Sequence, residues 1–330
     1  MKKCLAAIGA ALLLFAGCTS LSDEKAAPPA ITTLVLALPE GASRRLEETA
    51  RELIRRGEDF SQNTLAFELV YEKDIAQAME KGTAHIYIAE NAAAAQTWEK
   101  LNALELPYLF YNADHMVSGV NAPEFLKSLN KVAGLPVELR RVAFGGYIDM
   151  AGTLLQGEKE ERTEPVLLAL SQGFFTQQAQ EILEITQVTP LEGQTPLSVV
   201  HRGEAELGEV QADDVLLKSL EGQTLFFTQH RMVLVDIFFA SNMDEILPLR
   251  EQAALEEATV YAAGYCQTMA DEARKQTAAK AHETGAAGRS PNINNLFSRF
   301  GDLYSAQGRR AAPAYDKDLA KLLRQYGIKN

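Results

Sequence analysis

The amino-acid sequence predicts an α/β protein of two lobes that one long helix connects. Short apolar runs typical of buried strands alternate with helical periodicity over residues 31–100, and the short connections between them favour a largely parallel sheet. A second set of strand-like segments begins near residue 141. The segment from Pro248 to about Lys280 then keeps one helical pattern, much longer than the roughly 11–12 residues of an average helix.

The first lobe opens with a strand at Thr32–Leu38, which is rich in Val, Leu and Thr and is broken by Pro39-Glu40-Gly41. Ser43 is a good N-cap for a helix whose apolar residues recur at helical spacing until Gly57 ends it. A strand, a short helix and another strand are expected next, at Leu65–Tyr71, Asp74–Gly82 and Ala84–Ala89.

The second lobe is expected to contain a helix at Thr176–Ile185 and four strands, at Val142–Met150, Val166–Leu170, Gln187–Pro190 and Glu206–Val210. A long apolar stretch, Leu225–Ala240, is interrupted by polar residues at Thr228–Arg231. Terminal helices are expected at Asn294–Tyr304 and Asp316–Tyr326. We therefore divide the chain into lobe I (31–140), lobe II (141–235) and a return to lobe I with the connector helix and the C-terminal helices (236–330).

The N-terminus has the architecture of a secretory signal. Lys2 and Lys3 precede an apolar run from Leu5 to Phe15, and small residues lead to Cys18. This arrangement resembles a bacterial lipobox, which implies that residues 1–17 are removed and that the Cys18 thiol carries a lipid such as palmitate. Residues 18–30 then form a flexible tether, and the protein is extracytoplasmic and anchored to the membrane through this lipid. An uncleaved signal anchor is the alternative, but the run of about 15 residues is short of the ~20 that span a bilayer.

Charge and composition argue against several classes of protein. Loss of Lys2 and Lys3 takes the formal charge from −12 to −14, and such an acidic surface does not suit nucleic acid as a partner. Cys266 is the one cysteine of the body, so we expect no internal disulfide and a small buried apolar side chain. Five scattered histidines do not indicate a metal site, and no nucleophile has a visible base. We therefore expect neither enzyme activity nor a cofactor.

Five segments, in order, resemble the solute-binding proteins of tripartite ATP-independent periplasmic (TRAP) transporters, the DctP family. The segments are Leu34–Arg56, Asp74–Ala89, Glu105–Phe110 followed by Asp114-His115, Phe227–His230, and Leu247–Ala263. The resemblance implies a two-lobed periplasmic-binding-protein-like (flytrap) fold with a long interlobe helix. It also implies capture of a small-molecule solute, which is handed to TRAP membrane permease subunits. A ligand-sensing module and a degenerate scaffold lipoprotein of the same fold are the alternatives.

One departure from the family bears on the ligand. Members of the family usually bind a carboxylate through an Arg in a second-lobe strand, but the corresponding stretch here is Pro165–Leu170. No Lys, Arg or His occurs between Thr163 and Val200. Because a neutral side chain cannot replace the bidentate grip of an Arg, the ligand is expected to be neutral, cationic or zwitterionic, unless the site is remodelled.

Residues at strand ends and at the apolar interruption are the candidates for ligand binding. They are Glu40, Tyr108, Tyr147, Glu209, Gln229 and His230. Five of them have an ordinary alternative: a turn for Glu40, core packing for Tyr108, a solvated loop acid for Glu209, and hinge hydrogen bonding for Gln229 and His230. Asp236 lies inside an apolar run, where a buried acid would need a cation or several donors.

Overall fold

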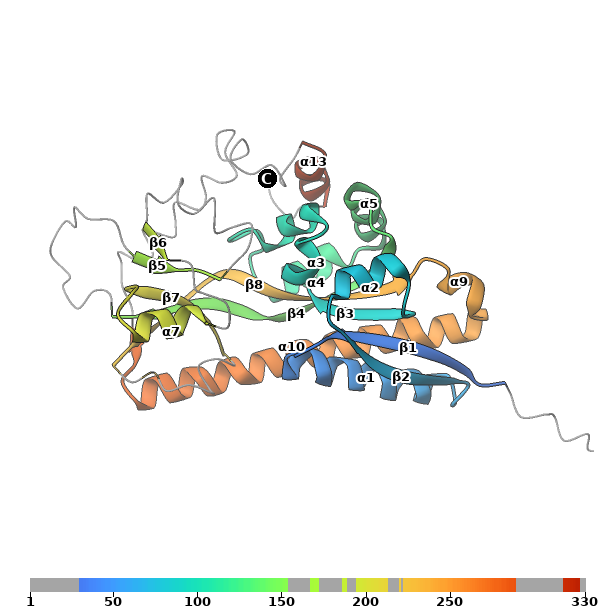
Figure 1. Ribbon diagram of the computed structural model, residues 1–330, viewed down its shortest axis with the longest axis horizontal. Coiled ribbons are helices and arrows are strands. Elements are labelled where there is room, and N and C mark those ends of the chain that lie inside the picture. Colours follow the sequence, from blue (N-terminus) through green and yellow to red (C-terminus); the bar gives the residue numbers. More distant parts are fainter. Residues whose placement is uncertain are drawn as a thin grey trace, which may run out of the picture.

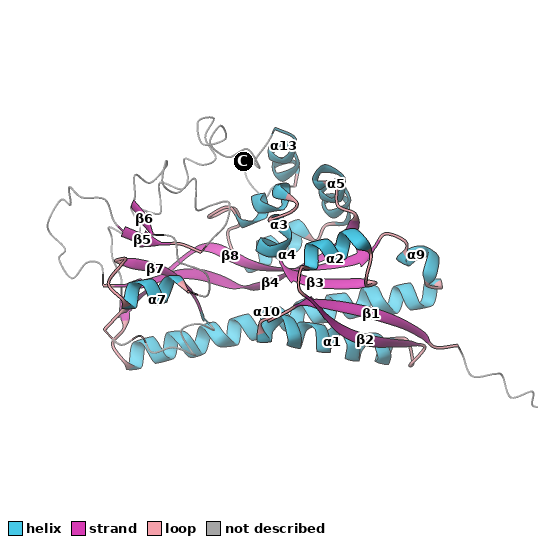
Figure 2. Ribbon diagram, viewed as in Figure 1, coloured by secondary structure: helices cyan, strands magenta, loops and turns pink. Residues whose placement is uncertain are grey.

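The computed structural model describes residues 30–153, 167–171, 186–188, 194–212, 220, 222–288 and 317–326. Within these residues the strands form one nine-stranded sheet with the order β2-β1-β3-β8-β4-β7-β5-β6, and β9 pairs with β8 (Figures 1 and 2). The sheet is elongated because β4 and β8 run through both halves of the molecule. Helices cover both faces: α1 and α10 lie on one, and α2 to α5 lie on the other (Figure 1).

The first half of the sheet is built from parallel strands. The elements here are β1 (Thr32–Pro39), α1 (Arg44–Phe60), β2 (Leu65–Glu72), α2 (Ile75–Lys81), β3 (Ile86–Glu90) and α3 (Asn91–Ala95). β1 pairs in parallel with β2 and with β3. Ser43 accepts a hydrogen bond from the Leu46 backbone N–H, as expected of the N-cap, and Gly82 ends α2 in the left-handed conformation.

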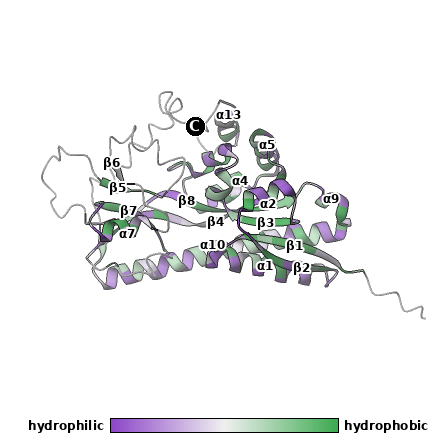
Figure 3. Cartoon of the chain, viewed as in Figure 1, coloured by the Kyte–Doolittle hydropathy of each residue, from purple (hydrophilic) through white to green (hydrophobic). Residues whose placement is uncertain are grey.

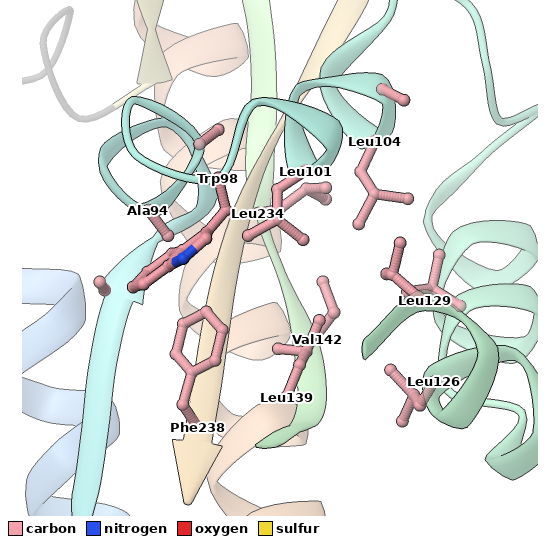
Figure 4. Packing of buried hydrophobic residues seen from close by; sticks show 14 of the residues in the cluster. Ala94, Trp98, Leu101, Leu104, Leu126, Leu129, Leu139, Val142, Leu234 and Phe238 are labelled. Carbon is pink, nitrogen blue, oxygen red and sulfur yellow. The ribbon is translucent and has the colours of Figure 1, made fainter. Parts of the chain in front are cut away.

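A layer of short helices covers the upper face of this half. It contains the 3-10 helix η1 (Glu99–Glu105), α4 (Ala113–Val120), α5 (Pro123–Ala133) and α13 (Lys317–Gln325). Apolar side chains from η1 and α5 meet those of the long strands, with Trp98, Leu129 and Phe238 among them (Figure 4). This cluster fixes η1, and therefore the segment that follows it, against β8.

Two long antiparallel strands connect the halves. β4 (Val137–Gly152) and β8 (Thr224–Ala240) pair along almost their whole length. β3 pairs with the C-terminal part of β8, whereas β7 (Leu207–Gln211) pairs with the C-terminal part of β4. The predicted interruption at Thr228–Arg231 is therefore not a chain break. It is a bulge, because the pairing passes from Ile148–Arg231 directly to Met150–Phe226.

The second half holds the shorter strands. They are β5 (Leu167–Ala169), β6 (Thr186–Val188), β7 and β9 (Ala287–Gly288), with α7 (Pro196–His201) beside them. β5 pairs in parallel with both β6 and β7. The predicted helices at residues 176–185 and 294–304 lie outside the described residues, as do the signal and Cys18.

The long helix is confirmed. After the single turn of α9 (Met243–Ile246), α10 (Leu249–Glu283) runs for 35 residues, about 50 Å. Its buried positions pack on α1 near its start, and Ala281 near its end packs with Leu197 and Val210 of the second half. Hydrophilic and hydrophobic residues alternate along it (Figure 3), and its exposed side chains include Val260, Tyr261 and Tyr265. Cys266 is fully buried in this packing, as the sequence predicts.

Candidate functional site

The strands of the two halves end opposite one another. Glu90, the last residue of β3, pairs with Val235, while Gln211, the last residue of β7, pairs with Ile148, which itself pairs with Arg231. Val235 and Arg231 lie four residues apart on β8, so the ends of β3 and β7 are separated by about 13 Å along this strand. The carboxyl ends of parallel strands are where α/β folds bind ligands. Throughout, "the crevice" means the region between these strand ends, with β4 and β8 as its floor.

A buried ion pair lies at the bottom of the crevice. The Arg231 guanidinium donates to Glu209 through Nη2 (2.8 and 2.9 Å) and through Nε (3.1 Å). The His230 Nε2 lies 3.0 Å from the same carboxylate, and the Ser171 backbone N–H donates to it at 2.7 Å. On the opposite side, Arg231 Nη1 is 3.8 Å from Glu105 of η1. Arg231 therefore bridges a carboxyl group from each half of the molecule.

Burial and charge shift the titration of these acids in opposite directions. Burial alone would raise the pKa of Glu209, but the charges of Arg231 and His230 outweigh it and hold that pKa well below its usual range. Glu105 gains less from Arg231 and also faces Glu90 and Glu209, so burial raises its pKa to about 7. Burial of Arg231 lowers its pKa, but Glu209 and Glu105 more than offset this and leave it raised.

A second acid, Asp149, forms hydrogen bonds that hold the bulge of β8 in place. Asp149 of β4 accepts the Gln229 backbone N–H at 2.8 Å and Nη1 of Arg274, from α10, at 2.9 Å. The Arg274 guanidinium also lies over the ring of Tyr147, 4.8 Å from its centroid, and over that of Phe227, 5.2 Å from its centroid. Burial raises the pKa of Asp149 despite Arg274. The long helix is therefore tied to both crossing strands at the level of the crevice.

Two non-glycine residues adopt left-handed backbone conformations beside this bulge. Gln229 has φ of 47° and Tyr108 has φ of 52°. The Tyr108 backbone N–H donates to the His230 carbonyl at 2.9 Å, and its hydroxyl donates to the Thr228 carbonyl at 3.2 Å. Such conformations cost of order 1–3 kcal/mol each and are held by surrounding contacts, often at functional sites.

Asp236 is paired with a single side chain. It is fully buried on β8, and its Oδ2 accepts from Nδ2 of Asn91 at 2.8 Å. The sequence led us to expect a cation or several donors. Instead, burial raises the pKa of Asp236 to about 8, so that the acid is largely protonated at neutral pH. Oδ1 of Asp236 and Oδ1 of Asn91 are both buried and have no hydrogen-bond partner.

The structure brings four of the six predicted ligand residues together. Tyr108, Glu209, Gln229 and His230 meet around the bulge, and a narrow cavity is lined by Tyr108, Gln229, His230 and Arg231 together with apolar side chains. Tyr147 lies beside this group, where its hydroxyl accepts the Ala113 backbone N–H. Glu40 is exposed just beyond the end of β1 and lies apart from this network. Their roles in ligand binding stay predictions.

Sequence reasoning missed five charged residues of the site. They are Arg45, Glu105, Asp149, Arg231 and Arg274. Arg45, at the start of α1, is buried and donates to Gln211 at the end of β7, so it joins the two halves across the crevice. A usable signal was present for Asp149, a charged residue inside the predicted strand Val142–Met150, and for Arg231, a charged residue within the apolar stretch Leu225–Ala240. Within the described part of the chain, no group of three metal-ligating side chains is found, and no helix is long and apolar enough to cross a membrane.

The arrangement defines a class of fold, that of two-lobed periplasmic solute-binding proteins. No family model matches the chain, and no curated protein matches it. Solved structures do. It is similar to a TRAP periplasmic solute binding protein of Ochrobactrum anthropi, with 15% identity, a TM-score of 0.73, and coverage of 92% of this chain and 98% of that one. It is likewise similar to one from Rhodobacter sphaeroides in an apo open state, with 12% identity, a TM-score of 0.75, and coverage of 90% and 100%.

A third structure contains a ligand. The protein from Haemophilus influenzae, with bound L-gulonate, shares 14% identity at a TM-score of 0.66, and the alignment covers 90% of this chain and 99% of that one. The chain thus has the fold of TRAP solute-binding proteins over nearly its whole length.

Proposed function

We propose that this protein is an extracytoplasmic solute-binding protein that captures a small organic solute and presents it to a TRAP-type permease. The observation that carries this proposal is the placement of the strand ends: those of the two halves lie four residues of β8 apart. The proposal is also supported by solute-binding proteins of the same fold, among them the protein from Haemophilus influenzae that has L-gulonate bound.

The mechanism follows from differential affinity. A solute that contacts both strand-end edges gains all of its contacts only when the halves approach, so binding shifts the equilibrium toward the closed form. The bulge of β8, with Gln229 and Tyr108 in left-handed conformations, is the place where the crossing strands depart from regular pairing. We take this bulge to be part of the hinge.

Small-angle X-ray scattering with a metabolite library tests capture. A bound solute is expected to lower the radius of gyration and to raise the melting temperature, because it binds the closed folded state and not the unfolded chain. If every solute leaves both quantities unchanged, capture is refuted. The scaffold alternative would then be favoured, and the Arg231–Glu209 pair at the crevice floor is the feature that speaks for it.

Cys18 is proposed to carry the lipid that anchors the protein. Expression with radiolabelled palmitate in a bacterial host is expected to label the wild-type chain, whereas Cys18→Ala remains unlabelled and is released from the membrane fraction. Cys266→Ala is the matched control, because Cys266 is fully buried in the body of the protein. Equal labelling of wild type and Cys18→Ala would contradict the proposed anchor.

A further inference from the structure

The strand β2 has one free edge. It pairs with β1 and with no other strand among the described residues, and Figure 1 shows it at the outer rim of the sheet. The carbonyl oxygen of Thr64, just before β2, and that of Glu72, at its end, both accept N–H groups of β1 at 2.8 Å. Backbone groups of successive residues in a strand point to opposite edges, so the odd-numbered residues of β2 face outward. The outward row consists of the N–H and C=O groups of Phe67, Leu69 and Tyr71.

Exposure and composition show that this edge is open. The leucines of β1, which is paired on both sides, are fully buried, whereas Phe67 and Leu69 are half-buried and Tyr71 is 45% exposed. Soluble proteins usually guard an edge strand with Pro, with Lys or other charges, or with a bulge. Leu65–Glu72 contains no Pro and no Lys, and its pairing with β1 is regular over all eight residues. Its two acids are the guard that it has, so any strand that pairs here must avoid them.

A second copy of β2 fits this edge in an antiparallel register centred on Leu69. Two identical strands related by a two-fold axis place one residue opposite its own copy. With Leu69 at that position, Phe67 lies opposite Tyr71 of the second copy, and the reverse pair forms as well. Both aromatic side chains are on the α1 face, because the Phe67 ring lies against Gly57 and the Tyr71 hydroxyl donates to Glu47 at 3.4 Å. The outward groups of these pairs would form about six main-chain hydrogen bonds.

The acids of β2 select this register from its neighbours. With Leu69 at the centre, Glu68 lies opposite Val70 of the second copy, and Glu72 lies opposite Ala66. No carboxylate then faces another directly. A register centred on Glu68 sets the two copies of that acid against each other, and one centred on Val70 sets Glu68 against Glu72. Like charges directly opposite in a sheet are destabilising, so both of these registers are disfavoured.

We propose that lobe I binds a second copy of this chain through β2, with antiparallel pairing centred on Leu69. Each copy closes the free edge of the other, so the assembly is limited to two chains at this edge. Two other strands, β1 and β3, separate β2 from β8, so the pairing leaves the floor of the crevice untouched. The inference is independent of the proposed function, because no solute takes part in the contact.

Sedimentation velocity of the full chain over a range of concentrations tests the pairing. The wild-type chain is expected to show an equilibrium between monomer and dimer. Tyr71→Glu is expected to weaken the dimer by about tenfold or more, because a charge replaces one ring of the aromatic pair with Phe67. Tyr111→Glu is the matched control, since Tyr111 is 79% exposed in the segment before α4, and it is expected to dimerise as wild type does. A wild-type chain that stays monomeric at every concentration, or equal dimerisation of the two variants, would overturn the inference.

Chemical cross-linking tests the register. In a chain with Cys4 and Cys18 replaced by Ser, Glu68→Cys is expected to give covalent dimers with a short bismaleimide. The two copies of residue 68 would be diagonal neighbours on one face of the joined sheet, about 7–8 Å apart. Glu80→Cys, which is exposed on α2, is the control and is expected to stay monomeric. Cys266 is fully buried in both chains. Cross-linking of Glu68→Cys that is no more efficient than that of Glu80→Cys would overturn the register.

Discussion

Replacement of Arg231 by Met is expected to destabilise the protein by about 3–5 kcal/mol at neutral pH, the usual cost of leaving a buried partner charge uncompensated. Both members of the Arg231–Glu209 pair are almost completely buried, with side-chain exposures of 5% and 1%. Urea unfolding at pH 7 measures the change. Arg202→Met is the matched control, because Arg202 forms an ion pair with Glu204 at 2.6 Å that is exposed at the surface. That variant is expected to unfold at almost the wild-type urea concentration.

The double variant Arg231→Met with Glu209→Gln separates the two causes of instability. The introduced amide would carry no charge and would still offer an oxygen to the Ser171 N–H, so most of the lost stability is expected to return. If Arg231→Met alone lowers the free energy of unfolding by no more than Arg202→Met does, Arg231 and Glu209 do not form a buried ion pair.

Replacement of Asp236 by Asn is expected to flatten the dependence of stability on pH. Burial raises the pKa of Asp236 from 3.8 to about 8 and that of Glu105 from 4.5 to about 7. The folded protein therefore holds protons that the unfolded chain has released. This contribution to stability is fully present below the unfolded pKa values and is lost as the pH rises through the folded ones, from about pH 4 to about pH 8.

Asn keeps the shape of Asp236 and an oxygen that accepts from Asn91, but it has no charge to bury. The variant is expected to be more stable than wild type by a few kcal/mol at pH 9 and nearly equal to it at pH 4. Urea unfolding at pH 4 and at pH 9 measures this difference. The dependence of stability on pH that remains in Asp236→Asn is assigned to Glu105. Lower stability of Asp236→Asn at pH 9 would show that the charged form of Asp236 has a partner, which would contradict this account.

The fold could be predicted from the sequence because its signals are local. The apolar run of Thr32–Leu38, the cap at Ser43 and the helical pattern after Pro248 each depend on residues adjacent in the chain, and each gives the expected element. The boundaries were less certain. β4 begins at Val137 and not at Val142, because its first residues pair with the end of β8.

The site could be predicted only in part, because its contacts join residues far apart in the sequence. Glu209 was selected as a ligand group, yet its oxygens accept from Arg231, 22 residues later, and from Ser171, 38 residues earlier. No local pattern specifies such a pairing. The left-handed conformations of Tyr108 and Gln229 were equally hidden, since neither residue is a glycine.

The absence of an Arg from residues 163–200 acquires a physical meaning in the structure. Arg231 places a guanidinium at the crevice floor from a different strand, but Glu209 occupies it with a bidentate contact. An arginine so engaged is not expected to bind an organic acid unless Glu209 releases it, and Glu209 has the lowered pKa of a strongly held partner. The sequence-based expectation of a non-anionic ligand therefore stays a prediction, with a structural reason added.

A distance measurement between the two halves tests the central claim, closure over a solute, most directly. Spin labels on Cys residues introduced at Glu80 of α2 and Arg202 beside α7 report this distance by pulsed electron resonance, in a chain with Cys4 and Cys18 replaced by Ser. Cys266 is fully buried and escapes labelling. A saturating concentration of a solute that binds the protein is expected to replace a broad distribution with a narrower, shorter one. An unchanged distribution in a sample that binds the solute by calorimetry would contradict closure.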